Sequence, residues 1–291
     1  MNTEMAYLLG MVLGNGEIQR NGNETTVTID IPHKNLRTDD GKDASVYVSA
    51  SLIDIEDIIK PLVGTDITHG QGRNSTQISF TKKNDDYTLR EIVRLVGFGT
   101  NHKFMKMPSE AFKFTHDEKI ALLRGFADVT AYIRRSNMAF SSEGQHRVYI
   151  EIPSNWDMVI DLANLLKTVD IPIQTIDFGH PNFRDSKAKK YNEGHTKYWK
   201  KEHQIKIWAN EFLPIGFNIK HKQEALEKYA EELLQVLNPE TTHEFYWQKR
   251  VRSRPVKISH PAESDDDLPS IIRGRHFNSW TELAAALGYH E

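Results

Sequence analysis

The chain has 291 residues, with 37 Lys and Arg against 40 Asp and Glu, and a formal net charge of −3. The absence of cysteine excludes disulfides, thiolate zinc sites and cysteine nucleophiles. A mean hydropathy of −0.56 argues against a membrane protein. The apolar run Met5–Leu13 is too short to span a bilayer and lacks the basic segment that precedes a signal sequence. We therefore expect an intracellular protein of the cytoplasm, the nucleoid or an organelle, and not a secreted one.

The first predicted element is an apolar helix over about Thr3–Gly14, which continues after Asn15 into an extended segment. Thr25–Ile31 alternates apolar and polar residues with a period of two, the pattern of a half-buried strand. Val46–Ala50 is predicted as a second strand, and the segment Ile53–Val63 after it is predicted as a helix.

The later elements continue this alternation of helices and strands. A second apolar helix begins after Thr115, a predicted N-cap with Glu118 at the capping-box position. The remaining predicted strands are Asp66–His69, Thr76–Thr81, Val148–Ile152, Ile173–Phe178 and His203–Trp208, and the remaining predicted helices are Tyr87–Val96, Trp156–Leu166 and Gln223–Leu237.

The chain is internally duplicated. Leu8–Ile18 and Leu123–Ile133, 115 residues apart, both read as the end of a glycine-containing apolar helix that runs into a strand. Val46 and Val148 are only 102 residues apart, so the second copy is expected to have lost about 13 residues between its first two strands. We predict an α+β fold of two similar halves, residues 1–97 and 115–237, joined by residues 98–114 and followed by a tail, residues 238–291.

The paired motifs and the order of the elements resemble the LAGLIDADG homing-endonuclease family in its single-chain, two-repeat form, over about residues 3–237. The resemblance implies two pseudo-symmetric αββαββα repeats whose saddle-shaped antiparallel sheets lie in the DNA major groove. It implies that the motif helices pack together through small residues spaced four apart, which are Gly10, Gly14, Ala121 and Gly125. The implied activity is site-specific hydrolysis of a long double-stranded DNA target by a monomer, with Mg²⁺ or Mn²⁺ held by one carboxylate from each helix end.

The chain departs from the pattern of this family at the positions of the catalytic residues. The positions of the two catalytic acids hold Asn15 and Thr130, and neither side chain supplies the anionic oxygen that Mg²⁺ prefers. One interpretation is that displaced acids, Glu17 or Asp128, act in their place. A second is that the protein binds DNA without cutting it, and a third is that Asn15 is a deliberate change from aspartate. The expected catalytic positions are Asn15, Thr130, Glu17 and Asp128, and the expected metal positions are Gly14, Asn15, Glu17 and Val129.

The leading hypothesis is thus a metal-dependent DNA endonuclease, impaired or inactivated at its acids, that serves intron mobility or host defence. The first alternative is a non-cleaving, sequence-specific DNA-binding protein on the same fold, acting as a regulator or accessory factor. The second alternative is an RNA-binding splicing factor.

Basic residues gather in two segments that the overall charge conceals. Residues 184–206 carry a net charge of +5 with interleaved aromatic residues, and residues 249–257 read as an extended basic arm. Residues 280–287 of the tail read as a short helix. Where two predicted contacts are adjacent on a strand, only one of them can face the groove. The predicted DNA contacts are Gln19, Arg20, Arg134, Arg135, Lys187, Lys189, Lys190, Lys197, Lys200, Lys201, Lys206, Lys249, Arg250, Arg252 and Arg254.

Overall fold

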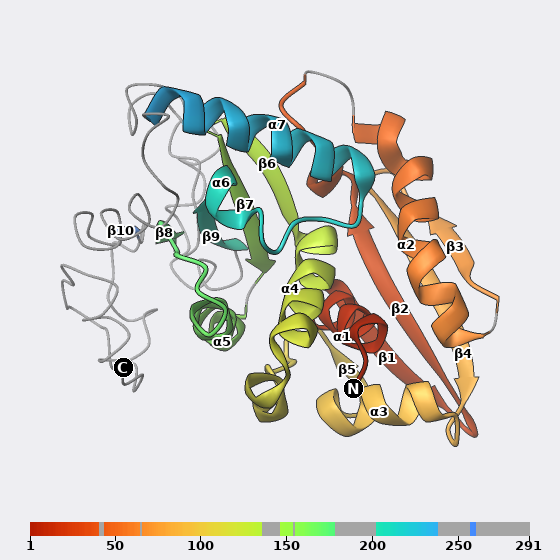
Figure 1. Cartoon of the computed structure of the whole chain (residues 1–291). Coiled ribbons are helices and arrows are strands. Elements are labelled where there is room, and N and C mark those ends of the chain that lie inside the picture. Colours follow the sequence, from red (N-terminus) through yellow and green to blue (C-terminus); the bar gives the residue numbers. More distant parts are fainter. Residues whose placement is uncertain are drawn as a thin grey trace, which may run out of the picture.

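The computed structural model describes residues 1–40, 44–64, 66–135, 146–153, 155–177, 202–237 and 257–259. Over these residues the protein is an α+β fold with two five-stranded sheets, in the orders β3-β4-β2-β1-β5 and β10-β8-β9-β7-β6. Helices α1 (Thr3–Asn15) and α4 (His116–Thr130) pack against each other at the centre of the molecule (Figure 1). The predicted fold class is confirmed.

The first half follows the predicted order of elements. Its antiparallel strands are β1 (Gly16–Asn21), β2 (Glu24–Pro32), β3 (Thr68–Gln71) and β4 (Ser75–Lys83). Its other helices are α2 (Val48–Val63) and α3 (Tyr87–Val96), and two 3₁₀ turns, η1 (His33–Leu36) and η2 (Ala44–Tyr47), lie between β2 and α2.

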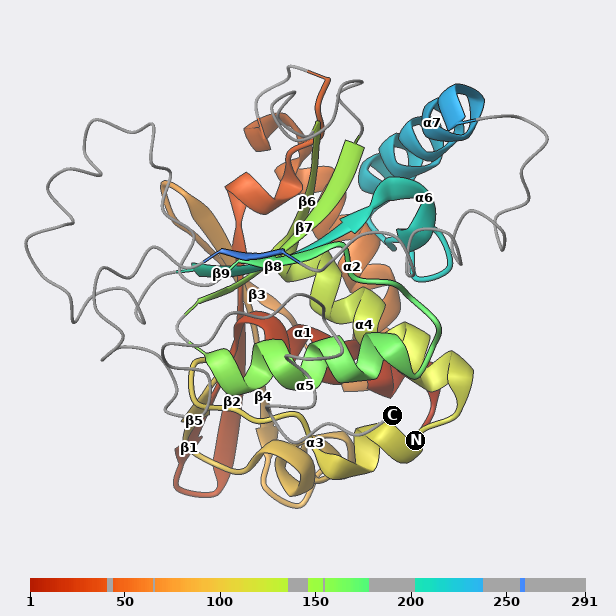
Figure 2. The same ribbon diagram turned by 90° about the vertical axis from the view of Figure 1, so that its left-hand side faces the viewer.

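The second half repeats the series after α4. Its strands are β6 (Ala131–Arg135), β7 (His146–Pro153), β8 (Thr175–Asp177) and β9 (Glu202–Trp208). Its other helices are α5 (Trp156–Lys167), α6 (Ala209–Phe212) and α7 (Lys220–Leu237). Viewed from the side, the strands of both sheets lie mainly on one flank of the molecule and the helices on the other (Figure 2).

The contact between α1 and α4 depends on glycine and is nearly symmetric. A methyl group added at Gly10 would lie 2.0 Å from the carbonyl oxygen of Leu122, and one added at Gly125 would lie 2.0 Å from that of Tyr7. Gly10 and Gly125 are 115 residues apart, as are Tyr7 and Leu122, so each helix makes the contact that its partner makes. The halves are therefore related by an internal twofold. The predicted close approach at both glycines is confirmed.

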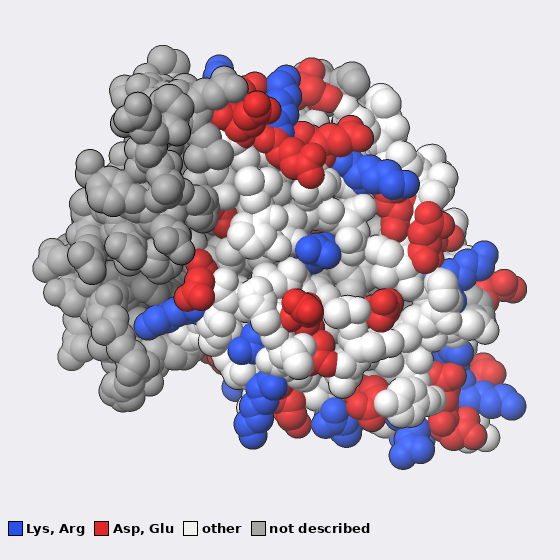
Figure 3. Space-filling model, in the orientation of Figure 1, with Lys and Arg blue, Asp and Glu red and all other residues white. Residues whose placement is uncertain are grey.

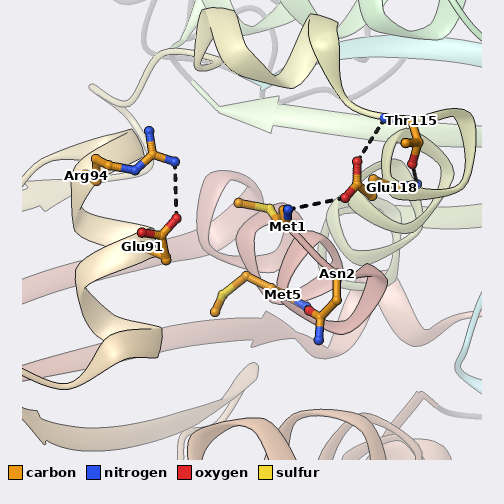
Figure 4. A network of polar contacts seen from close by, with 7 residues as sticks. All are labelled: Met1, Asn2, Met5, Glu91, Arg94, Thr115 and Glu118. Carbon is orange, nitrogen blue, oxygen red and sulfur yellow. Dashed lines mark hydrogen bonds and ion pairs between the residues drawn. The ribbon is translucent and has the colours of Figure 1, made fainter.

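Polar side chains cap the beginning of both central helices (Figure 4). Asn2 Oδ1 accepts a hydrogen bond from the Met5 amide at 2.9 Å at the start of α1. At the start of α4, Thr115 Oγ1 accepts from the Glu118 amide, and Glu118 Oε2 accepts from the Thr115 amide at 2.8 Å, which confirms the predicted capping box. The amino group of Met1 lies 3.4 Å from Glu118 Oε1, so the two helix starts are linked.

The predicted strand at Val46–Ala50 is wrong. These residues form the end of η2 and the first turn of α2, which begins at Val48 instead of Ile53. Within this first turn, Ser51 Oγ donates to the Tyr47 carbonyl four residues earlier, a hydrogen bond that a helix permits. Alternation over five residues is too short to separate a strand from the start of a helix.

In each half the strand that pairs with the first strand is the next one that the structure describes. Gly16 pairs with Ile29 in the first half, and Ala131 pairs with Ile150 in the second. The offset between the halves therefore rises from 115 at Gly16 and Ala131 to 121 at Ile29 and Ile150. The expected loss of 13 residues is wrong, because it matched β7 with the segment that starts α2.

The joining segment and the tail each add a strand to a sheet. β5 (Thr100–Asn101) pairs with β1 before a 3₁₀ turn, η3 (Ser109–Lys113), leads to α4. β10 (Lys257–Ser259) pairs in parallel with β8. Within the described ranges, no helix combines the length and apolar character that a membrane span requires.

Candidate nucleic-acid interface

Strand alternation gives each sheet an inner face against the helices and an outer face away from them. In β2 the inner residues Val27, Ile29 and Ile31 are buried, whereas Thr26 and Thr28, which alternate with them, stay partly exposed. The resemblance to the LAGLIDADG family implies that the outer faces are the surfaces turned toward nucleic acid.

The outer face of the first sheet is a layer of hydrogen-bonding side chains in fixed register. Thr26 lies opposite Thr81 with their hydroxyl oxygens 2.9 Å apart, and Ser79 donates to Thr28 at 3.0 Å. Gln19 on β1 lies opposite Thr26 and extends that row. The charged members of this face are Glu17, Glu24, Asp30 and Lys83, so it carries more acids than bases. Such a layer suits hydrogen bonding to base edges better than attraction of phosphates.

The outer face of the second sheet has a different chemistry. Tyr132 and Tyr149 stack with their ring centroids 5.2 Å apart. The guanidinium of Arg134 lies 6.0 Å from the Tyr149 ring and the Lys206 ammonium lies 5.5 Å from it. The Arg147 guanidinium, from the same face, lies 4.2 Å from the ring of Trp208. Glu151 also has this orientation, and Arg147 and Glu151 are both buried. Arg134 and Lys206 are therefore the cations beside an aromatic ring that this face offers to phosphates.

The alternation of side chains along β1 and β6 determines which residue of each adjacent pair of predicted DNA contacts faces outward. Gln19 and Arg134 lie on outer faces. Arg20 and Arg135 have the inward parity of the buried strand residues, and Arg20 places its guanidinium 4.9 Å from the ring of Phe98. Arg20 and Arg135 are therefore the members of each pair that do not face outward.

Most of the predicted basic contacts lie outside the described residues, together with the tail helix. These contacts are Lys187, Lys189, Lys190, Lys197, Lys200, Lys201, Lys249, Arg250, Arg252 and Arg254. Lys206 is described and lies on the outer face of β9, opposite Tyr149.

The opposite flank, which the helices cover, does not concentrate positive charge. Among the described residues on this side, acids and bases are interspersed, and acidic side chains gather over α7 (Figure 3). The helical flank is therefore a poor surface for phosphate.

The expected acid positions lie where α1 and α4 end. Asn15 is 8% exposed, and its Nδ2 donates to the Val129 carbonyl at 2.9 Å. Asn35 on η1 donates to the same carbonyl, also at 2.9 Å. A carbonyl oxygen has two lone pairs, so two amide groups of the chain saturate Val129 as an acceptor.

Other carbonyls at the helix ends are also engaged by the chain. Lys222 Nζ on α7 lies 2.7 Å from the Ala131 carbonyl oxygen and 3.2 Å from two further carbonyl oxygens of α4. At the equivalent end of α1, the His102 amide donates to the Gly16 carbonyl at 2.8 Å. Cations and N–H donors are stabilising at the C-terminal end of a helix, which carries partial negative charge. In this protein Lys222 supplies the cation and the His102 amide supplies the N–H donor.

Thr130 and Asp128 point into the protein. The Thr130 hydroxyl donates to the Phe126 carbonyl in the preceding turn at 2.6 Å. Asp128 is fully buried, and its Oδ2 accepts from the Tyr7 hydroxyl at 2.8 Å and the Asn218 amide at 3.1 Å. Burial raises the pKa of Asp128 and is opposed by the nearby ammonium group of α7. These contacts give Asp128 a structural role between α1, α4 and the segment before α7.

Glu17 is the expected site acid that remains on the outer face. It follows the end of α1 on β1, is partly exposed, and accepts a hydrogen bond from Gln19 Nε2 at 2.8 Å. Glu17 thus remains an outer-face carboxylate directly after the end of α1.

The donor set at the helix ends does not fit a divalent metal. Mg²⁺ requires near-octahedral oxygen ligands, usually including carboxylates. Asn15 and Thr130 offer no anionic oxygen, and both lone pairs of the Val129 carbonyl are taken. Among the described residues, no group of three His, Cys, Asp or Glu side chains is placed to hold a metal ion. The expected metal set of Gly14, Asn15, Glu17 and Val129 stays a prediction, and Glu17 is its one carboxylate.

Comparison with known proteins gives likeness in structure only. No family model and no curated protein matches the chain. Its structural neighbours include LAGLIDADG proteins. A variant of I-DmoI in complex with its target DNA in the presence of Mn is 14% identical, with a TM-score of 0.40, and the match covers 77% of this chain and 97% of that one. Other I-DmoI structures hold DNA and Ca, or target DNA in the presence of Mg.

A second neighbour is full-length DUF199/WhiA from Thermatoga maritima, which is 11% identical with a TM-score of 0.44 over 84% of this chain and 64% of that one. The N-terminal LAGLIDADG domain of DUF199/WhiA is 12% identical with a TM-score of 0.37 over 77% of this chain and 82% of that one. At TM-scores this low, the function of the chain has to be argued from its own residues.

Sequence reasoning missed three residues at the helix ends. Asn35, His102 and Lys222 come from η1, the joining segment and α7, and each donates to a carbonyl at the end of a central helix. No motif marks them, because each acts through a contact between segments that lie far apart in the sequence.

Replacing Asn15 by aspartate is expected to destabilise the protein without creating a metal site. The new carboxylate cannot donate to the Val129 carbonyl and places negative charge beside it, at a cost of about 2 kcal/mol. Urea denaturation should show a lower midpoint that Mg²⁺ does not restore. Asn35→Asp is the matched control, because it meets the same carbonyl. A Mg²⁺-dependent recovery confined to Asn15→Asp would contradict this account.

Proposed function

We propose that this chain binds double-stranded DNA as a monomer, with the outer faces of both sheets turned toward the duplex. The observation that carries the proposal is the outer face of the first sheet, where Gln19, Thr26 and Thr81 form a row of hydrogen-bonding side chains across three strands. A surface of this kind, held in register by backbone pairing, is suited to reading base edges in the major groove.

The two outer faces complement each other in this function. The first sheet offers hydroxyl and amide groups but more acids than bases, so it provides little attraction for phosphate. The second sheet offers Arg134 and Lys206 beside Tyr149, and these cations supply the salt-dependent part of the affinity. The glycine contact between α1 and α4 joins the two faces within one chain, which supports binding by a monomer.

The proposed activity is binding without metal-dependent cleavage at the helix ends. Cleavage of the kind that the resemblance implies requires carboxylates that hold divalent metal near the phosphate. In this chain amide and ammonium groups occupy the acceptors at those positions. Binding needs only the outer faces, which these contacts leave in place.

Two substitutions should distinguish a side chain that recognises base pairs from one that attracts phosphates. Thr26→Val removes a hydroxyl at nearly constant volume and is expected to cost about 1 kcal/mol or more for the preferred duplex while relaxing specificity at one base pair. Arg134→Gln should weaken all sequences equally and reduce the slope of log affinity against log salt concentration by about one. Fluorescence anisotropy with a duplex selected from a random pool measures both effects, with Thr3→Val as the control on an exposed threonine of α1.

Three outcomes would contradict the proposal. The first is duplex affinity that does not change with salt, because phosphate contacts must release counterions. The second is equal affinity for the same sequence as double-stranded RNA, whose major groove is too narrow for a sheet. The third is cleavage of the selected duplex in Mg²⁺ or Mn²⁺ that is lost in Glu17→Gln.

A further inference from the structure

The joining segment presents a solvent-exposed phenylalanine on a firmly held turn. Phe104 is 81% exposed, the highest value among the exposed large hydrophobic side chains of the described residues. It follows β5, and its own amide donates to the Asn101 carbonyl at 2.8 Å. The Lys103 amide donates to Asn101 Oδ1 at 3.1 Å, and Met105, next to Phe104, is buried. The backbone on both sides of Phe104 is therefore fixed.

Both halves of the protein hold this turn. The His102 amide donates to the Gly16 carbonyl, where α1 passes into β1. Asn155, at the start of α5 in the second half, donates through Nδ2 to the carbonyls of His102 and Met105 at 2.9 and 2.8 Å. The turn is thus anchored to the end of α1 in the first half and to the start of α5 in the second.

Two lysines lie beside Phe104 in the joining segment. Lys103 is exposed, and Lys106 is 76% exposed with only a 3.5 Å contact to the exposed Asp157. The turn therefore presents an aromatic ring beside two cations, a combination that binds bases and phosphates together.

We infer that Phe104 is a wedge that inserts between two base pairs at the centre of the bound DNA, while Lys103 contacts the adjacent phosphate. This inference rests on the proposed function. An apolar side chain that enters a base step from the minor groove unstacks it and bends the duplex. A ring held in place before binding loses little conformational freedom when it inserts. The preferred DNA should therefore carry a pyrimidine–purine step at its centre, because such steps unstack most readily.

The test compares four proteins on the duplex that the unaltered chain selects from a random pool. They are the unaltered chain, Phe104→Ala, Phe104→Leu, which keeps an apolar wedge, and Tyr87→Ala, which removes an aromatic ring that is 75% exposed on α3. Phe104→Ala is expected to bind about tenfold more weakly, whereas Phe104→Leu keeps most of the affinity and Tyr87→Ala keeps all of it. With 2-aminopurine at the central step, fluorescence should rise on binding of every protein except Phe104→Ala.

A mismatch at the central step gives a second readout. It lowers the cost of unstacking, so it should tighten binding by the unaltered chain and Phe104→Leu but not by Phe104→Ala. Equal affinity and equal 2-aminopurine signal for Phe104→Ala and the unaltered chain would overturn the wedge while leaving the proposed function intact. If the unaltered chain binds no duplex, the proposed function fails and the wedge fails with it.

Discussion

Alanine at Gly10 or at Gly125 is expected to destabilise the packing of the two halves of the protein. The added methyl carbon would lie 2.0 Å from a carbonyl oxygen of the facing helix in either case. Backbone atoms cannot rotate away as a side chain can, so α1 and α4 would have to move apart along their whole contact. We expect the free energy of unfolding to fall by about 3 kcal/mol or more, the upper range for overpacking a core.

Urea denaturation of both variants measures this effect. Gly70→Ala is the matched control, because its methyl group would meet only Gln77 side-chain atoms, at 3.7 Å. The internal twofold predicts that the Gly10 and Gly125 variants lose similar amounts. Native stability in either of them would contradict the close helix contact.

Replacing Lys222 by methionine is expected to be the most damaging change outside the glycine contact. The ammonium is fully buried, donates to three carbonyl oxygens of the α4 end, and lies 4.3 Å from the ring of Phe217. Burial lowers the pKa of Lys222 to about 7, and the carboxylate of Asp128 opposes this shift. Only the ammonium form has three N–H donors for three carbonyls, so these carbonyls also favour the charged form.

Lys222→Met leaves the carbonyls and the buried Asp128 without their cation, which costs about 3–5 kcal/mol of stability. Asp128→Asn removes the opposite charge and keeps the acceptor for the Tyr7 hydroxyl. In a double-mutant cycle followed by urea denaturation, the double variant should lose about 1 kcal/mol less than the sum of the single losses. Additive losses would show that the two groups act independently.

The sequence was most informative where a pattern is local. The capping box at Thr115 and Glu118 and the bounds of the helix Tyr87–Val96 are present as predicted. The repeat at an offset of 115 correctly placed Gly10 opposite the second motif helix, because small residues on one face permit close approach only where another helix lies. The duplication thus located the centre of the molecule before any contact was known.

Contacts between distant segments were beyond this kind of reasoning. The sequence showed that Asn15 and Thr130 lack carboxylates, but not that Asn35 would share the Val129 carbonyl with Asn15. It raised Asp128 as a displaced acid, and only the fold shows that the carboxylate is enclosed beside Tyr7. The strand predicted at Val46 failed for a local reason, since a short alternation also fits a helix start.

The turn that carries Phe104 also bears on how the chain assembles. The α1 and α4 helices make equivalent contacts. If the two halves were separate, the α1 of one chain would therefore pack as well against the α4 of a second chain as against its own. The covalent joining segment, with its turn held by Gly16 and Asn155, keeps α4 near α1 at a far higher effective concentration than any neighbouring molecule reaches. The joining segment thus favours packing of α1 against the α4 of the same chain. A cut inside this segment would make the contact between the two halves depend on protein concentration.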